Sequence, residues 1–322
     1  MGNSLASSSA DSSGFTSDVV DEFEQQRLAL FARHGFEGES RRVADREGRT
    51  TYVLRRGEGA PPTVLVHGGL SQASEWALLA GKLPGHVVVA DRPGCGLSSP
   101  IDYSGVDFRM AATDWLLDVM DGIAAHQVDL VGSSMGGFFS MAFAVAHPDR
   151  VRRLILVGAP AGLDRKLPLF PRLWGNPVTG PLITRSRITD PEVLRKKVFA
   201  RLLVARPERL SRAFLEVMVA AMALPGVDRA AYTMLRNVTT LRGWRPHLMM
   251  RDDVARLPVP TRFVWGDDDA FASPSSGRAM VAEMPHADIV RLADTGHLPH
   301  VDRPDAVADA IVRFLGPRPA GE

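Results

Sequence analysis

Short apolar runs alternate with longer segments of helical periodicity along most of this chain. Six runs have the length and the branched apolar content of buried strands, at residues 63–66, 86–90, 128–131, 154–157, 262–265 and 288–292. Continuous apolar strands that are separated by helices are typical of a parallel sheet covered on both faces. The pattern therefore predicts an α/β fold, with a mostly parallel central sheet and helices on both of its faces.

The N-terminal part of the chain differs from this alternation. Residues 1–18 are rich in Ser, Gly, Asn and Asp, and we expect a disordered tail there because few large apolar side chains offset the entropy of ordering. A helix is expected over 19–33. An antiparallel hairpin with strands at 41–44 and 50–54 follows it.

The strand pattern also stops after Pro160, and it resumes at Thr261. Helical periodicity fills the interval, for example over 191–203 and 207–223, and a last helix is expected over 304–315. We interpret the interval as a helical cap inserted over the sheet. The predicted division is a tail at 1–18, an α/β core at 19–159 and 251–318, and a helical cap (lid) at 160–250.

The composition is that of an ordinary globular protein, with 322 residues of which 45% are hydrophobic and 23% charged. A single cysteine, Cys95, excludes a disulfide within the chain. The net charge of +1 gives no sign of a nucleic-acid or membrane partner. The longest mostly apolar run, at 138–146 with Ser140 inside it, is shorter than the roughly 18 residues that a membrane span needs. No secretory signal pattern is visible, so we expect a cytoplasmic protein.

The segment from Gly132 to Gly136 has the pattern Gly-x-Ser-x-Gly, with Ser134 at its centre. The pattern alone occurs roughly 0.2 times by chance in a chain of this length, but its position is specific. A predicted strand ends at Val131, and an apolar helical run begins near Gly137. A nucleophile elbow requires this order of strand, tight turn and helix. Ser134 is therefore the predicted nucleophile.

A glycine pair follows the strand at 63–66, in the sequence His67-Gly68-Gly69. In a site built around a nucleophile elbow, the loop after this strand contributes one backbone N–H of the oxyanion hole, and the residue after the nucleophile contributes the other. Glycine lets the backbone approach a substrate oxygen closely. The predicted donors are the N–H groups of Gly69 and Met135. We expect His67 to be a structural hydrogen-bonding residue.

Two later strands are each followed by candidate catalytic groups. The aspartates Asp267 to Asp269 follow the strand at 262–265, and His297 follows the next strand. The order Ser, Asp, His along the chain is the order found in α/β hydrolases. Loops at the carboxyl ends of parallel strands open on one crevice, so these groups can converge. Composition does not choose among the three aspartates.

These motifs, together with the segment at 91–98, resemble the α/β-hydrolase superfamily in the branch with a helical cap. The resemblance covers about 45–160 and 258–316, and it is weak in the cap. It implies a serine hydrolase that transfers an acyl group through a covalent intermediate, with no metal and no cofactor. The expected partner is a small-molecule substrate with an apolar acyl or alcohol group.

The resemblance also implies which acid and which histidine act. In the family, the acid stands after a glycine and two variable polar residues, which selects Asp269. The base directly follows a glycine, which selects His297 and not His300, three residues later. The implied triad is Ser134, His297 and Asp269.

Several reactions share this triad, and the sequence leaves them open. Haloalkane dehalogenases and epoxide hydrolases of this fold use Asp at the elbow, which Ser134 argues against. Carbon–carbon bond hydrolases of aromatic meta-cleavage pathways often read Gly-Asn-Ser-Met-Gly-Gly, and Ser133 replaces that Asn here. Lactonases, cofactor-free haloperoxidases and a non-enzymatic small-molecule receptor also remain. An esterase is the broadest fit, and the substrate and the oligomeric state stay open.

Overall fold

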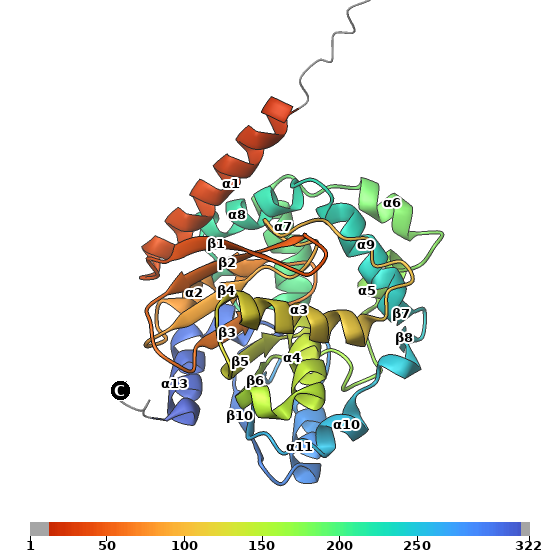
Figure 1. Cartoon of the computed structure of the whole chain (residues 1–322). Coiled ribbons are helices and arrows are strands. Elements are labelled where there is room, and N and C mark those ends of the chain that lie inside the picture. The colour runs from red at the N-terminus through yellow and green to blue at the C-terminus, as the bar shows by residue number, and fades with distance from the viewer. Residues whose placement is uncertain (1–12, 317–322) are drawn as a thin grey trace, which may run out of the picture.

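The computed structural model of the chain describes residues 13–316 (Figure 1). Within them, eight strands form one sheet in the order β1-β2-β4-β3-β5-β6-β9-β10. The bounds are β1 (Glu39–Ala44), β2 (Thr50–Arg56), β3 (Thr63–Val66), β4 (Val87–Ala90), β5 (Val128–Ser133), β6 (Val151–Val157), β9 (Thr261–Gly266) and β10 (Ala287–Leu292). Strands β1 and β2 form the predicted hairpin, β2 is antiparallel to β4, and the other neighbours are parallel. The mostly parallel sheet is therefore confirmed.

Two apolar layers cover the sheet, because successive side chains of a strand point to opposite faces. In β3, Val64 and Val66 belong to one layer and Leu65 to the other. The first layer is completed by α3 (Phe108–Gly122), α4 (Met135–Ala146), α10 (Arg251–Ala255) and α11 (Pro274–Glu283). The second is completed by α1 (Ser13–Arg33), α2 (Ala77–Ala80) and α13 (Pro304–Leu315). Single helical turns occur between these elements along the chain, at η1 (Ala73–Trp76), η2 (Pro148–Arg150) and α12 (Pro299–Asp302).

Helix α1 begins at Ser13, earlier than the predicted start at residue 19, so the predicted tail over 1–18 is too long at its end. Residues 1–12 of that tail lie outside the described residues. Phe23 and Phe31 anchor the helix in the core. Once a helix is nucleated, each further residue adds a hydrogen bond for the cost of fixing only itself. Polar residues can therefore extend a helix that tertiary packing holds elsewhere.

The interval that we predicted as a cap is mostly helical. Its elements lie next to one another, beside the carboxyl edge of the sheet (Figure 1). Its elements are α5 (Leu169–Trp174), α6 (Gly180–Arg185), α7 (Pro191–Leu194), η3 (Arg195–Leu203), η4 (Pro207–Arg209), α8 (Arg212–Met222), α9 (Val227–Val238), β7 (Thr239–Thr240), β8 (Gly243–Trp244) and η5 (Pro246–Leu248). The hairpin of β7 and β8 corrects the expectation of an interval without strands. Two residues per strand are too few to produce a recognisable alternation.

Helix α1 links this interval to the core. It packs against α2 and η1 of the core and also against α8 of the cap (Figure 1). Ser211 defines the start of α8, because its side chain accepts a hydrogen bond from the N–H of Phe214. Buried side chains of α1 and α8 belong to the same apolar layer, so the second layer of the core continues onto α8.

Candidate active site

The turn between β5 and α4 holds Ser134 in a strained conformation. Its φ is 49° and its ψ is −108°, a backbone conformation that residues with a Cβ rarely adopt. The flanking glycines make this turn possible. A Cβ on Gly136 would lie 2.1 Å from the carbonyl oxygen of Val66, and one on Gly132 would lie 2.5 Å from that of Gly136. The small residues of the motif are therefore required by close backbone contacts.

Three predicted residues are brought together at the carboxyl edge of the sheet. The Oγ of Ser134 lies 2.8 Å from Nε2 of His297. Nδ1 of the same ring lies 2.9 Å and 3.0 Å from the two carboxylate oxygens of Asp269. A carboxylate at Nδ1 leaves Nε2 free to accept the serine proton. The geometry is that of an activated nucleophile.

Asp269 and His297 are held by further contacts and are almost fully buried, at 8% and 2% exposed. The carboxylate accepts hydrogen bonds from the N–H groups of Ala159, at 2.9 Å, and Phe271, at 2.8 Å. The phenyl ring of Phe271 stacks on the imidazole with 3.8 Å between ring centres. Of the three consecutive aspartates, Asp267 instead pairs with an exposed arginine of β10.

The two predicted oxyanion donors lie side by side. A Cβ built on Gly69 would be 3.5 Å from the Cβ of Met135, and both residues line the same cavity as Ser134. The neighbouring N–H of Gly68 is already donated to Oε1 of Glu75 at 3.1 Å. This arrangement favours Gly69 over Gly68 as the loop donor. Its role in the reaction stays a prediction.

Glu75 and His300 form a buried pair beneath this loop that the sequence analysis missed. Nε2 of His300 lies 3.1 Å from Oε1 of Glu75, and the ring packs 4.1 Å from that of Trp76. Burial alone would raise the pKa of Glu75, but the hydrogen bond and charge of His300 outweigh it and lower this pKa to about 2. One signal was present in the sequence: a glutamate within the mostly apolar stretch of η1 and α2.

His67 has the structural role that we predicted. Its Nδ1 lies 2.9 Å from the carbonyl oxygen of Gly68, and its Nε2 accepts a hydrogen bond from the N–H of Arg92 at 2.9 Å. The Nδ1 proton is therefore donated to that carbonyl. Burial and the nearby Arg92 guanidinium lower the pKa of His67 to about 4, so the ring is neutral at ordinary pH.

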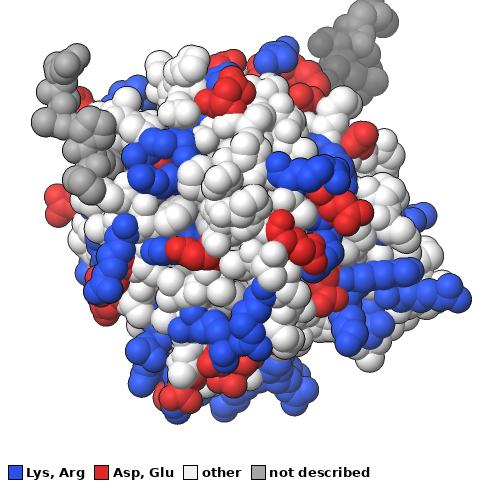
Figure 2. Space-filling view, turned by 90° about the horizontal axis from the view of Figure 1, so that it is seen from below, with Lys and Arg blue, Asp and Glu red and all other residues white. Residues whose placement is uncertain are grey.

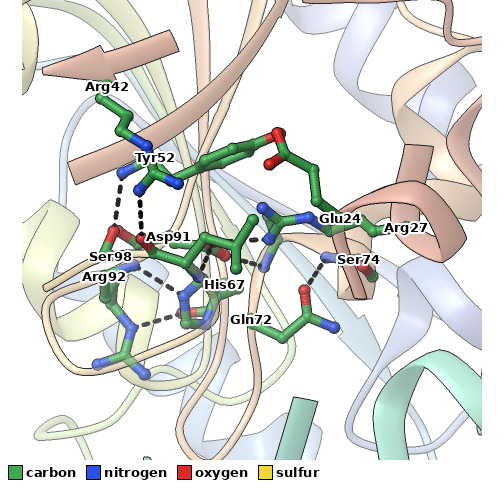
Figure 3. A network of polar contacts seen from close by, with 12 residues as sticks. Glu24, Arg27, Arg42, Tyr52, His67, Gln72, Ser74, Asp91, Arg92 and Ser98 are labelled. Carbon is green, nitrogen blue, oxygen red and sulfur yellow. Dashed lines mark hydrogen bonds and ion pairs between the residues drawn. The ribbon is translucent and has the colours of Figure 1, made fainter. Parts of the chain in front are cut away.

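A second buried network joins α1 to the site (Figure 3). Nη1 of Arg27 lies 2.6 Å from Asp91, and neither side chain is exposed. The same carboxylate accepts from the N–H groups of Ala73, at 2.7 Å, and Leu97, at 2.9 Å. The guanidinium also lies over the ring of Tyr52, 4.2 Å from its centre. Asp91 thus fixes α1, the start of η1 and the turn at 94–97 relative to one another.

A cavity of about 230 Å³ lies over Ser134 and His297. The predicted core and the interval at 160–250 that we predicted as a cap both contribute residues to its wall, which is mostly apolar. Among the larger lining side chains are Leu167, Phe170, Trp174, Phe199, Met218, Met234, Leu235 and Phe271. The methionines that we noted as a possible adaptable wall, Met218, Met222 and Met234, all line it.

The model of the alpha/beta hydrolase family matches residues 63–310 of this sequence. The chain belongs to the alpha/beta hydrolase family. The predicted α/β-fold hydrolase is therefore confirmed at the level of the family. The match begins at β3, so α1, β1 and β2 lie outside it.

Two curated relatives span most of the chain. A cis-3-alkyl-4-alkyloxetan-2-one decarboxylase from Shewanella oneidensis is 27% identical over 85% of this chain and 88% of its own. A 2-hydroxy-6-oxononadienedioate/2-hydroxy-6-oxononatrienedioate hydrolase from Cupriavidus pinatubonensis is 26% identical over 87% of this chain and 96% of its own.

Solved structures with the same fold include enzymes of two kinds. A carboxylesterase from Bacillus subtilis matches with a TM-score of 0.71 and 18% identity, over 92% of this chain and 98% of its own. A meta-cleavage product hydrolase from Pseudomonas fluorescens matches with a TM-score of 0.69 and 20% identity, over 86% and 97%. At these identities the likeness shows the shared fold.

Among the helices within residues 13–316, none combines the length and the apolar character that a membrane span requires. No group of three or more His, Cys, Asp or Glu side chains in this part of the chain could hold a metal ion.

The lowered pKa of Glu75 predicts a pH-dependent contribution to stability. A carboxyl group whose pKa is lower in the folded state stabilises the fold above its unfolded pKa, and this contribution is lost as pH falls through the folded pKa. We expect Glu75→Gln to lower the free energy of unfolding at pH 7 by on the order of 3 kcal/mol. The difference from the parent should shrink below about pH 4.5 and vanish near pH 2. Urea unfolding at pH 7, 5 and 3 measures it.

Glu58→Gln is the matched control, because Glu58 is exposed. It should leave the free energy of unfolding unchanged at each pH. A loss at Glu75 that is independent of pH would contradict the charged form of this residue in the fold.

Arg27 provides a second stability prediction. Arg27→Met leaves the carboxylate of Asp91 buried without its cationic partner, which costs about 3–5 kcal/mol in comparable cases. Denaturant unfolding should show a loss of this size, whereas Arg33→Met at an exposed position of the same helix should show almost none. Equal effects of the two substitutions would mean that the ion pair contributes nothing.

Proposed function

We propose that this chain is a serine hydrolase that cleaves an ester of a small, neutral and largely apolar molecule. The observation that carries the proposal is the hydrogen-bonded series from Ser134 through His297 to Asp269, which lies at the floor of a mostly apolar cavity. We propose the cytoplasm as its location.

The proposed reaction follows from this geometry. Ser134 Oγ attacks the ester carbonyl while Nε2 of His297 takes its proton. The imidazolium then returns that proton to the leaving alcohol, and an acyl-enzyme remains. Water attacks the acyl group with the same ring as base and releases the carboxylic acid and free Ser134. Asp269 stabilises the imidazolium in both halves.

Gly69 and Met135 are the proposed oxyanion donors. Their N–H groups would hold the negative oxygen that develops on the substrate carbonyl. Removing one such donor in comparable enzymes costs about 3–4 kcal/mol of the barrier. The contact between Gly68 and Glu75 supports the assignment, since it holds the loop that carries Gly69 in place.

The charges around the cavity favour a neutral substrate. Lys166 and Arg187 are the cationic residues among those that line it, and both are exposed. Arg187 is also paired with Asp228, at 3.0 Å. A buried carboxylate needs a charged or hydrogen-bonding partner. The lining therefore fits an uncharged acyl or alcohol group better than a dicarboxylate.

A carbon–carbon bond hydrolase is the second candidate. It is supported by the relative from Cupriavidus pinatubonensis, whose name describes hydrolysis of a dienedioate. The relative from Shewanella oneidensis is named for an alkyl-substituted oxetanone, a strained lactone, which supports a lactone as a further variant of a neutral acyl substrate. A small-molecule receptor with an unused triad is the non-enzymatic alternative.

Ser134→Ala tests the nucleophile. We expect kcat on a p-nitrophenyl ester to fall by about 10⁴-fold or more, because no acyl-enzyme can form. Ser133→Ala is the matched control, since the Ser133 hydroxyl is buried without a hydrogen-bond partner among the described residues. It should retain near-parental kcat. A fluorophosphonate probe should label the parent and not the Ser134 variant, and an unlabelled parent would favour the receptor.

Three separate Asp→Asn substitutions at 267, 268 and 269 test the acid. Asn keeps the size of the side chain and removes its charge. We expect kcat to fall by about 10²–10⁴-fold at Asp269 only, because the imidazolium loses its partner. Near-normal turnover of Asp269→Asn would sink the proposed triad.

A substrate series tests the neutral, apolar cavity. We expect kcat/KM to rise from p-nitrophenyl acetate to the butyrate and hexanoate, since each buried CH₂ contributes about 0.8 kcal/mol. A lactone and a vinylogous diketone carboxylate are assayed beside the esters. A higher kcat/KM for the anionic diketone than for every ester would favour the carbon–carbon hydrolase instead.

A further inference from the structure

Charge is divided very unevenly between the two parts of this chain. Residues 160–250 hold 16 Lys and Arg but 6 Asp and Glu, a balance of +10. The remainder holds 22 against 31, a balance of −9. The net charge of +1, from which we expected no membrane partner, conceals this division. A charged partner responds to the local field of the surface it meets and not to the sum over the chain.

The positive part of the chain also exposes large apolar side chains. Leu169 of α5 is 58% exposed, Val178 is 76%, Leu182 of α6 is 64%, and Leu241 in the turn between β7 and β8 is 55%. Helices α5 and α6 pack against each other. The turn is joined to α5 by a hydrogen bond from Nη1 of Arg172 to the carbonyl oxygen of Leu241, at 2.9 Å. These residues therefore form one surface. We call residues 165–185 and 241–242 the cap rim.

Basic side chains stand among these apolar ones. Arg165, Lys166, Arg185 and Arg242 of the cap rim are exposed. Arg165 lies beside the turn, because its carbonyl oxygen accepts a hydrogen bond from the N–H of Trp244 at 3.1 Å. Figure 2 shows long basic side chains that project from the edge of the molecule on its right, the side on which α5, α6 and the hairpin of β7 and β8 lie in Figure 1.

The cavity above Ser134 is lined in part by exposed residues of the cap rim. Phe170 lines the cavity and is also 38% exposed, and the exposed Lys166 lines it as well. A molecule that enters at this point passes between apolar side chains from the surface to the cavity. The cap rim and the cavity therefore both favour apolar molecules.

We propose that the cap rim docks on an anionic lipid surface, from which an apolar molecule reaches the cavity. Exposed aliphatic side chains with basic residues around them match both layers of such a surface, the acyl chains and the negative headgroups. Single-stranded nucleic acids bind instead to basic grooves with aromatic side chains on which the bases stack, and exposed leucine and valine offer no such stacking. The charge balance of the cap and the exposure of its aliphatic side chains thus favour lipid.

Vesicle cosedimentation of the full chain tests this proposal. Vesicles of phosphatidylcholine alone are compared with vesicles that contain 30% phosphatidylglycerol, at about 0.05 M and 0.5 M salt. We expect binding to the anionic vesicles at low salt and its loss at high salt, because salt screens the attraction. The Ser134→Ala variant should bind equally well, so the result does not depend on the proposed hydrolase activity.

Substitutions at the cap rim localise the binding. The triple variant Arg165→Gln, Arg185→Gln and Arg242→Gln should lower the partition coefficient about 100-fold, since each basic residue near such a surface contributes about fivefold. The triple variant Leu169→Ser, Val178→Ser and Leu182→Ser should lower it at least about tenfold. None of these six residues lines the cavity. Both variants should therefore keep the turnover of a short soluble ester.

Two substitutions away from the cap are the controls. Met110→Ser replaces a side chain that is 60% exposed on α3, and Arg278→Gln replaces an exposed basic residue on α11. Both should bind vesicles like the parent. The proposal is overturned if the parent does not bind anionic vesicles at low salt, or if the controls lose as much binding as the rim variants. It is equally overturned if the parent self-associates in solution and the triple variant Leu169→Ser, Val178→Ser and Leu182→Ser does not, or if the parent binds duplex DNA more tightly than lipid.

Discussion

The close approach of α4 to the sheet is the constraint on which the rest of the site depends. At Gly136 the backbone of the helix passes so near the end of β3 that a Cβ would lie 2.1 Å from the carbonyl oxygen of Val66. This contact sets the sharp turn in which Ser134 adopts a positive φ. The strained residue thereby stands above the sheet edge, where the loops after β9 and β10 can reach it. The strain persists because the packing around it determines the backbone.

Buried polar groups then hold the loops around that turn. Asp91 receives hydrogen bonds from two loop N–H groups and from Arg27 of α1, and Glu75 receives one from Gly68 beside the nucleophile. An unpaired charge in such a place would be costly, so each carboxylate is satisfied by several donors. The loops around Ser134 are thus held in place by residues that do not themselves touch the reacting atoms. Helix α1 takes part in this, although it lies outside the segment that matches the family.

The cap adds properties that the core does not have. It forms much of the wall of an apolar cavity over Ser134, and its net charge is positive whereas that of the core is negative. Exposed leucine and valine side chains occur on α5, on α6 and in the segment that joins them. Apolar surface that remains exposed in a folded protein commonly marks a place of contact. Residues 160–250 therefore contribute both to the wall of the cavity and to the exposed surface beside it.

The sequence by itself determined the strands, the elbow and the order of the candidate catalytic groups. Apolar runs, glycines and their spacing are local signals, and β3, β5 and α13 follow them almost to the residue. The cap was recognised only as helical, and its hairpin and the early start of α1 were missed. Local periodicity is weak in such short or polar segments, and tertiary packing decides them.

Only the tertiary structure decided how distant residues meet. The choice of Asp269 among three aspartates was made by family resemblance, and the fold brings that carboxylate to His297. The pairing of Glu75 with His300, and of Arg27 with Asp91, joins residues that no sequence pattern connects. The surface on which charge and apolar side chains gather likewise comes from separate segments. These features depend on contacts between elements far apart in the chain, and periodicity along the sequence carries no information about them.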